Sequence, residues 1–299
     1  MSTNLSRILS ISILISVFSS TTLFALENDS RPLLFMNFSG SSNDPGWLFK
    51  LDTAAGYRFN RHFEVTAGIP IYMVHVSKQT LEDGFESKTG IGNAYVDLRV
   101  MGEHDRFYFS SSLRGAAPTG DETEGFSSGR AALDWNNYLE YDGGKWVPFI
   151  SAGIANSVSD THFFTRPFTS LGIVGQFEGG LLYNPSWWVG LGGSGYAVIP
   201  TGEQKIYSRL YGSRMQSGSQ SQNESDGYMR KRRAFEESFY TFSDAEAVKD
   251  HGFSGWLDVY FSPEISMELG YSRSVSYEYN TVFFAVRFDL AGMIGGERD

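Results

Sequence analysis

Apolar and polar side chains alternate in segments of about ten residues that recur along this chain from Pro32 to Leu290. Alternation with a period of two is typical of β-strands, because successive side chains point to opposite faces. Every second gap between the segments is a tight turn, and most of the other gaps are longer and polar. Short turns at one end and long loops at the other are typical of an outer-membrane β-barrel.

We count twelve such segments. They are expected at residues 32–39, 46–59, 63–73, 91–101, 106–117, 130–141, 146–158, 171–182, 187–199, 252–261, 264–275 and 278–290. Tight turns follow the second, fourth, sixth, eighth and tenth segments, which puts both chain ends on the turn side, as an even-stranded barrel requires. The gap after the eleventh segment is short for an external loop, so ten and fourteen strands remain as alternatives.

A soluble periplasmic β-sandwich or lipocalin-like barrel is the alternative fold, because its strands also alternate. The polar faces carry charges of both signs, which suits a wet lumen. Aromatic residues also cluster near the segment ends, where a transmembrane barrel has its girdles. They are Trp47, Tyr57, Phe59, Phe63, Phe107, Trp146, Trp187, Trp188, Phe261 and Tyr271. The sequence therefore predicts an all-β fold, a transmembrane antiparallel up-and-down β-barrel of about 12 strands.

The start of the chain has the layout of a secretory signal peptide. Arg7 gives a positive beginning, an apolar run from Ile8 to Phe18 follows, and a small, polar region ends at Ala25. A membrane anchor is the alternative, but the run is too short to span a bilayer. We expect residues 1–25 to be a cleaved signal peptide and residues 26–299 to form one barrel domain in the bacterial outer membrane, with both termini periplasmic.

Composition adds several exclusions. The chain has no cysteine, which excludes a disulfide framework and thiol metal sites. Its five scattered histidines give no metal-ligand spacing, and no cofactor is expected. A net charge of −10 argues against a nucleic-acid partner. A mean hydropathy of −0.23 would suit a soluble protein, but only alternate residues of a barrel face lipid. The expected partners are outer-membrane lipid, lipopolysaccharide and a small solute.

The interval 200–250 departs from the strand pattern and is expected to be a long extracellular loop, in which the stretch Tyr211–Lys249 contributes no strand. Its first half, from Tyr211 to Gly227, is rich in Gly, Ser, Gln and Asn, which is typical of disorder. Its second half holds the basic run Arg230–Arg233. Three phenylalanines follow at near-helical spacing, Phe235, Phe239 and Phe242. This loop is interpreted as solvated, as a contact to lipid phosphates, or as a segment that folds in and narrows the pore.

Two short motifs resemble a known family. The first is Gly-Ile-Gly-Asn-Ala-Tyr-Val-Asp-Leu-Arg from Gly90 to Arg99, and the second is Pro-Thr-Gly-Asp from Pro118 to Asp121, followed by a Gly/Ser loop and Trp135. They are similar to landmarks of the MetA-pathway phenol-degradation type outer-membrane proteins, over about residues 45–290. That family commonly has Asp where Asn93 stands. The resemblance implies a transporter or channel barrel. It does not imply phenol as the solute, and it supplies no catalytic residues.

Charged residues recur on the expected lumen face and are the candidate pore-lining residues. The basic ones are Lys50, Arg58, Arg99, Arg114 and Arg287. The acidic ones are Asp52, Glu64, Asp97, Asp134, Glu140, Glu178, Asp258 and Glu268. One interpretation is a charged constriction that selects solutes, with a weak preference for cations. The other is that opposite charges pair and brace the barrel wall.

The predicted function is passive passage of small solutes, and two alternatives remain. A lipid hydrolase could use His75 and Ser77, which share a strand face, because some outer-membrane lipases use a His-x-Ser pair with the hydroxyl as nucleophile and the imidazole as base. The surrounding residues lack the fuller phospholipase motif. A structural or adhesive barrel without transport is the second alternative. The run Gly192–Gly195 lies inside a predicted strand and indicates close packing rather than a phosphate loop.

Overall fold

The computed structural model describes residues 30–44, 46–77, 87–122, 124–157, 168–208, 240–243 and 249–294. These residues form strands and one short helix, α4 (Leu290–Ile294). The strands are β1 (Arg31–Asn43), β2 (Gly46–Asn60), β3 (Phe63–Val76), β4 (Lys88–Ile91), β5 (Tyr95–His104), β6 (Phe107–Ala116), β7 (Ala132–Tyr141), β8 (Trp146–Ser157), β9 (Phe168–Ser186), β10 (Val189–Ser208), β11 (Tyr240–Ser243), β12 (Asp250–Ser262), β13 (Ile265–Ser274) and β14 (Tyr279–Asp289).

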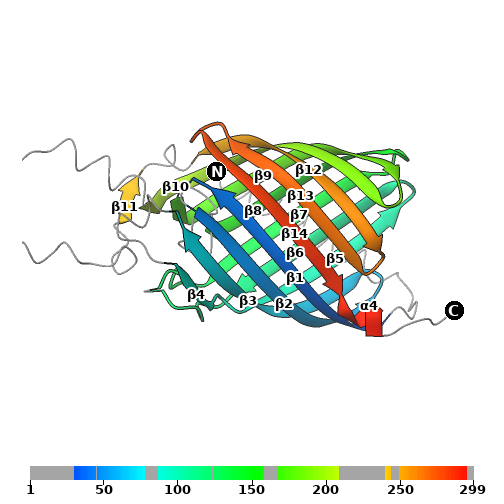
Figure 1. Ribbon diagram of the computed structural model, residues 1–299, viewed down its shortest axis with the longest axis horizontal. Coiled ribbons are helices and arrows are strands. Elements are labelled where there is room, and N and C mark those ends of the chain that lie inside the picture. Colours follow the sequence, from blue (N-terminus) through cyan, green and yellow to red (C-terminus); the bar gives the residue numbers. More distant parts are fainter. Residues whose placement is uncertain are drawn as a thin grey trace, which may run out of the picture.

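Twelve of these strands form a closed antiparallel barrel in which sequence neighbours lie side by side (Figure 1). The barrel closes where β1, in blue, pairs with β14, in red, with Phe35 opposite Asp289. The short strands β4 and β11 are additions to the barrel, because β4 pairs with β3 and β11 pairs with β10. The predicted fold class and the twelve barrel strands are confirmed.

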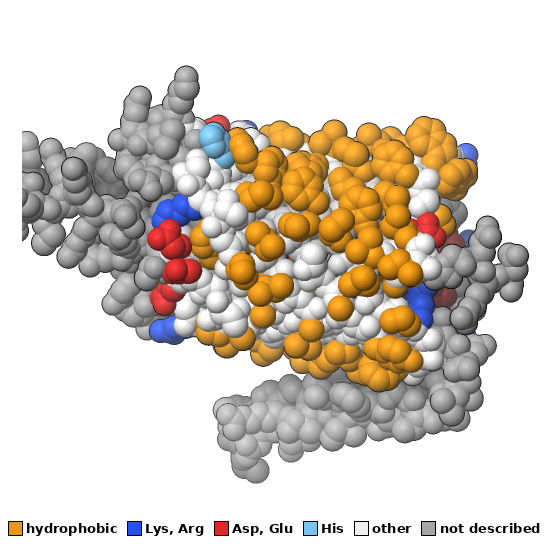
Figure 2. Space-filling model, turned by 60° about the horizontal axis from the view of Figure 1, so that its bottom comes forward, with side chains coloured by type: hydrophobic (Ala, Val, Ile, Leu, Met, Phe, Trp, Pro, Cys, Tyr) orange, Lys and Arg blue, Asp and Glu red, His pale blue; other side chains and the backbone are white. Residues whose placement is uncertain are grey.

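The outer surface of the barrel is apolar. On β8, Ile150 is 60% exposed and Ile154 is 53% exposed, whereas the neighbouring Ser151 points inward and lines a cavity. Figure 2 shows hydrophobic side chains over the middle of the barrel and charged side chains gathered toward its two ends. A soluble barrel places its apolar residues inside. The observed facing therefore excludes the sandwich and lipocalin alternatives and is that of a transmembrane barrel.

Aromatic side chains gather on the outside at the turn end. Tyr57, Phe59 and Phe63 contact in a row, with ring centroids 5.1 and 5.4 Å apart. On another part of the barrel, Trp146 lies 4.3 Å from Tyr183. Aromatic rings are favourable at this height because they have an apolar body and a polar edge. The predicted girdle is present at this end.

The two ends of the barrel differ in their connections. Tight turns join β2 to β3, β5 to β6, β7 to β8, β9 to β10 and β12 to β13. At the other end the connections are longer, except for the short ones after β1 and after β13. The sequence pattern predicted the short connection after β13 but not the one after β1. The first segment was predicted to end at Ser39, whereas β1 continues to Asn43, which shortens the connection to β2. Arg31 and α4, at the two ends of the described barrel, both lie at the turn end.

The interval 200–250 contains residues of β10 and β11. Because β11 lies within Tyr211–Lys249, the prediction that this stretch contributes no strand is wrong. β10 continues to Ser208, and β11 pairs with its outer part, with Tyr207 opposite Tyr240. The rest of the interval, which includes the basic run Arg230–Arg233, lies outside the described residues, as does the predicted signal peptide.

A bulge shapes the outer part of β10. Its register against β9 shifts between Thr201 and Lys205, where Gly202 has a φ of 73°. The buried Gln204 amide donates hydrogen bonds to the carbonyls of Ile173 and Thr201, at 3.2 and 3.1 Å. These bonds join the bulge to Ile173 of the neighbouring strand β9 and to Thr201 of β10 itself.

Candidate functional site

The two sequence motifs lie against each other at the loop end of the barrel. The backbone N–H of Gly120 donates to the side-chain oxygen of Asn93 at 3.2 Å, and the N–H of Ala94 donates to the hydroxyl of Thr119 at 2.8 Å. The hydroxyl of Thr119 also lies 3.4 Å from the carbonyl of Gly92. The loop between β6 and β7 is therefore fixed to the segment that precedes β5.

This loop reaches the inner face of the barrel wall. Phe126 is 3% exposed and stacks on Tyr72 of β3, with ring centroids 6.5 Å apart. Tyr72 points inward, because its neighbour Ile71 is among the exposed residues of the outer surface. Lys50 lies 5.9 Å above the same tyrosine ring. The contact is supported by an ion pair between Lys88 and Glu124. The loop thus occupies space inside the barrel beside β3, near the loop end.

The predicted charged residues of β2, β3, β5 and β6 form ion pairs across strands. Three contacts join nitrogen and oxygen atoms of neighbouring strands: Arg58–Glu64 at 2.9 Å, Arg99–Glu64 at 3.2 Å and Arg114–Asp97 at 3.0 Å. A fourth, Lys50–Asp52 at 3.2 Å, lies within β2. The hydroxyl of Tyr95 donates to Asp52 at 2.9 Å, and the guanidinium of Arg114 lies 4.3 Å from the Tyr95 ring. Asp134 stands opposite Arg114 in the register of β6 and β7. Basic and acidic groups on this part of the wall therefore balance.

The remaining predicted residues form a more acidic group on β7, β9, β12, β13 and β14. They are Glu140, Glu178, Asp258, Glu268 and Arg287. Glu140 accepts a hydrogen bond from Tyr138 at 2.7 Å, and Asp258 accepts one from the Trp256 indole at 3.1 Å. Asp258 and Glu268 occupy opposed register positions, and both lie within electrostatic range of Arg287.

Two cavities open beside this acidic part of the wall. The cavity nearer the loop end has a volume of about 330 Å³, and the one nearer the turn end about 370 Å³. Glu178 lines both, so the cavities adjoin one another along the barrel. Asp258, Glu268 and Arg287 line the turn-end cavity. The predicted charged residues of β2, β3, β5 and β6 line neither cavity.

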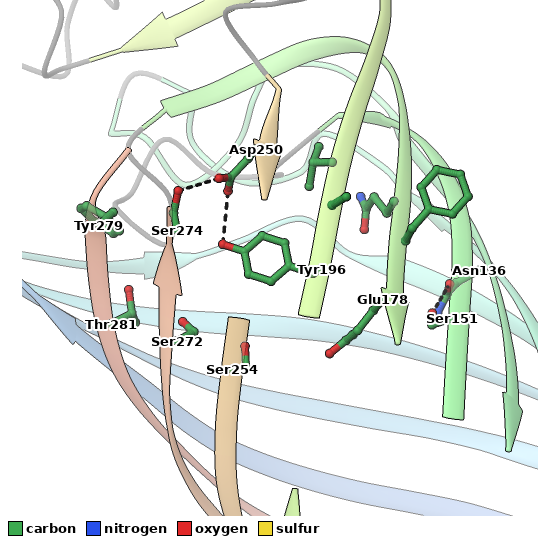
Figure 3. Close-up of a pocket in the computed structure, with 14 residues that line it drawn as sticks. Asn136, Ser151, Glu178, Tyr196, Asp250, Ser254, Ser272, Ser274, Tyr279 and Thr281 are labelled. Atoms are coloured by element: carbon green, nitrogen blue, oxygen red, sulfur yellow. Dashed lines mark hydrogen bonds between the residues drawn. The ribbon is translucent and has the colours of Figure 1, made fainter. Parts of the chain in front are cut away.

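The loop-end cavity is lined by polar side chains from seven strands (Figure 3). Asp250 accepts hydrogen bonds from Ser274 at 2.5 Å and from Tyr196 at 3.3 Å. Ser151 donates to Asn136 at 2.9 Å. The other polar lining residues are Gln176, Glu178, Ser254, Ser272, Tyr279 and Thr281. Hydroxyl, amide and carboxylate groups are present, and the described lining includes no Lys, Arg or His.

The sequence did not predict this cavity, because only charged residues of the inner face were taken as candidates for lining the pore. Tyr196, Ser274 and Thr281 are uncharged, and Asp250 was placed at the end of the predicted loop although it begins β12. The available signal was the alternation of small hydroxyl residues, such as Ser272 and Ser274, with the outward-facing Tyr271.

Gly192 allows a tryptophan to cross the inner face of β10. A Cβ atom at Gly192 would lie 2.0 Å from the ring of Trp256, which lines the turn-end cavity. At Gly193 the nearest atom would be 3.8 Å away. Gly192 therefore permits the close approach that was predicted for this glycine run.

His75 lies on the outer surface near the loop end. Its ring stacks on Trp47, with centroids 4.6 Å apart, and its Nδ1 lies 3.1 Å from the hydroxyl of Ser87. Ser87, on the far side of the β3–β4 connection, was not part of the predicted His-x-Ser pair.

The described residues contain no group of three or more His, Asp or Glu side chains placed to hold a metal ion. No helix in the described ranges is long and apolar enough to cross a membrane.

The fold is similar to that of solved outer-membrane barrels. The COG4313 outer membrane channel from Pseudomonas putida matches with a TM-score of 0.52 and 8% identity, over 87% of this chain and 94% of that one. The NanC porin matches with a TM-score of 0.46 and 9% identity, over 85% and 98%. The KdgM porin in complex with disordered oligogalacturonate matches with a TM-score of 0.42 and 7% identity, over 85% and 98%. At these identities a likeness shows the fold alone, and only the first of the three supports it.

No protein-family model matches the chain, and no curated protein matches its sequence. The resemblance to the MetA-pathway type proteins is therefore not confirmed at the level of that family.

Proposed function

We propose that this protein is a passive channel of the bacterial outer membrane for small polar solutes. The observation that carries the proposal is the pair of adjoining cavities, joined at Glu178, inside a closed barrel with an apolar exterior. A barrel that served only as a scaffold or an adhesin would be expected to fill its lumen with packed side chains. Here open space remains beside β7 to β14, where the two cavities lie.

The predicted charged residues then divide into two roles. Glu64, with its two arginines, and the Arg114–Asp97 pair brace the wall, because opposite charges close together satisfy one another in a narrow barrel. Glu178, Asp258, Glu268 and Arg287 face the path of the solute, because they line the open cavities. Glu140 contributes to the negative potential of this path through its position beside Tyr138.

The orientation follows from the connections. Short turns face the periplasm and long loops face outward in outer-membrane barrels, so both chain ends and α4 are proposed to be periplasmic. The predicted signal peptide of residues 1–25 would direct export.

Kinship with the MetA-pathway phenol-degradation type proteins is part of this proposal. Its support is that the two motifs of the resemblance, at Asn93 and at Thr119–Gly120, contact each other directly.

The hydrolase alternative has less support than the channel. His75 stacks on Trp47 on the outer surface and has the hydroxyl of Ser87 at 3.1 Å. Ser77→Ala should therefore leave the function of the protein unchanged. Lipid hydrolysis by the purified protein that disappears in Ser77→Ala would establish the hydrolase instead.

Two measurements test the channel. The protein should be recovered from the outer-membrane fraction as a band that migrates faster in detergent gels before heating than after it. The refolded protein should then give stepwise conductance in planar bilayers, whereas the heat-denatured protein should give none. Recovery from the soluble periplasm, or a folded protein without conductance, would contradict the proposal.

A further inference from the structure

We infer that the loop-end cavity selects small polyhydroxylated solutes that are neutral or positively charged, and that it disfavours solutes carrying a carboxylate. This inference rests on the proposed channel function and names the class of solute that the channel admits.

The lining of the cavity matches a solute rich in hydroxyl groups. Side-chain hydroxyls come from Ser151, Tyr196, Ser254, Ser272, Ser274, Tyr279 and Thr281. A hydroxyl both donates and accepts hydrogen bonds, and the amides of Asn136 and Gln176 offer both functions as well. Such a surface can replace the water around a polyol, because each solute hydroxyl meets a group that can bond in either sense. An apolar aromatic solute would displace water from this polar surface without replacing the hydrogen bonds of that water.

The charges of the cavity have one sign. Glu178 and Asp250 both line it, and the described lining contains no basic side chain. Their carboxylates are held in place, since Ser194 donates to Glu178 at 2.6 Å and Ser274 donates to Asp250 at 2.5 Å. Figure 3 shows Glu178 and Asp250 on different strands of the same wall. A solute carboxylate entering this space would approach both negative groups, whereas an ammonium group would be attracted.

The next cavity along the barrel continues this preference. Beyond Glu178, a solute meets Asp258 and Glu268, and among the described lining residues only Arg287 is basic. Discrimination against anions at the loop-end cavity is therefore not reversed deeper in the lumen.

The volume limits the size of the solute. About 330 Å³ lies at the lower end of the range of roughly 300–1,000 Å³ that is typical of ligand pockets. A single sugar ring fits this description better than an oligosaccharide.

The test uses three solutes that share one ring and differ in charge: glucose, glucosamine and glucuronate. Uptake of each radiolabelled sugar is measured into liposomes that contain the refolded full chain, at low salt. Glucosamine and glucose should enter at comparable rates, with glucosamine at least as fast, and glucuronate about fivefold more slowly, as expected for one like-charge contact in water. High salt should reduce the difference.

Variants connect the discrimination to the cavity. Glu178→Gln should bring glucuronate uptake closer to that of glucose, and the double change Glu178→Gln with Asp250→Asn should do so further. Both replacements keep side-chain volume and one acceptor oxygen, while the second oxygen becomes an NH2 donor to which a neighbouring hydroxyl can turn its oxygen. Glu103→Gln removes an exposed carboxylate at the turn end of β5 and should preserve the order of the wild type. Heat modifiability of each variant shows that it has folded. If the double variant does not fold, the comparison of Glu178→Gln with the wild type is sufficient for the test.

The outcomes separate the two proposals. Equal uptake of all three sugars, faster uptake of glucuronate, or discrimination that Glu178→Gln leaves undiminished would overturn the inference and leave the channel standing. A folded protein that admits none of the sugars and conducts no ions would contradict the channel, and the inference with it.

Discussion

The side-chain oxygen of Asn93 accepts a hydrogen bond from the backbone N–H of Gly120, at 3.2 Å. Asn93 is 1% exposed, so the bond is protected from water. It connects the segment before β5 to the loop that places Phe126 on Tyr72. One buried amide thus helps to hold an inward-facing loop against the wall.

Asn93→Ala should loosen this loop. The change removes the acceptor of the half-buried Gly120 N–H, and the loss of one hydrogen bond costs about 0.5–1.5 kcal/mol. Hydrogen exchange at residues 119–126 should become faster, up to about tenfold, measured by mass spectrometry on the folded protein. Asn93→Asp keeps the oxygen and is the control. Equal exchange in the wild type and in Asn93→Ala would show that other contacts fix the loop.

Facing of the strands can be tested with adjacent residues of β8. Ile150→Arg should impair assembly, because it puts a charge on the lipid face at a cost of about 2–4 kcal/mol near the midplane. Ser151→Arg should assemble, since Ser151 lines the cavity and stands opposite Glu178 in the register of β8 and β9. The readout is the fraction of heat-modifiable protein after refolding. An equal loss of heat-modifiable protein in both variants would show that Ile150 does not face lipid while Ser151 faces the lumen.

A second adjacent pair tests close packing on β10. Gly192→Ala should destabilise the barrel by about 1–3 kcal/mol, the usual cost of overpacking, because its Cβ would meet the Trp256 ring at 2.0 Å. Gly193→Ala should be neutral or slightly stabilising, since its Cβ has nothing closer than 3.8 Å and alanine restricts the unfolded chain. Denaturant midpoints in detergent or bilayers measure both. Equal midpoints for both variants would mean that Trp256 moves without cost.

Arg287→Ser should raise the preference of the channel for cations. Among the described residues that line the turn-end cavity, Arg287 is the basic one, so its loss leaves the negative charges of Asp258 and Glu268 unopposed within that lining. A change of up to about fivefold in the permeability ratio is expected at low salt, and less at high salt. Arg99→Ser should have a smaller effect, because Arg99 pairs with Glu64 and lines neither cavity. Reversal potentials in a salt gradient measure both effects. A larger effect from Arg99→Ser would indicate that ions pass along the wall formed by β2, β3, β5 and β6 instead.

Much of the barrel could be predicted from the alternation of side chains, because one face of every strand meets lipid and the other does not. The positions of the tight turns gave the strand order around the barrel. The ends of the strands were less predictable. Asp250 and Tyr207 lie beyond the apolar segments, and nothing in their own side chains distinguishes a strand from a loop there.

The site was only partly predictable for a different reason. Alternation predicts which side chains point inward, as it did for Glu178 and Glu64. It does not predict which of them meet another side chain and which face open space, because that depends on residues brought together from distant strands and loops. Phe126 is an example, since its contact with Tyr72 comes from a loop whose path the strand pattern does not determine.

The pairing of β1 with β14 also has a consequence for biogenesis. It joins Phe35 to Asp289, so the ring is completed by residues from opposite ends of the chain. Contacts of such high sequence separation form late, because a long loop must be closed before they contribute. Until then both strands present unpaired N–H and C=O groups, which hydrocarbon cannot satisfy. Ring closure must therefore precede or accompany entry into the bilayer, and a chain shortened before β14 should fail at insertion even though its other hairpins can still form.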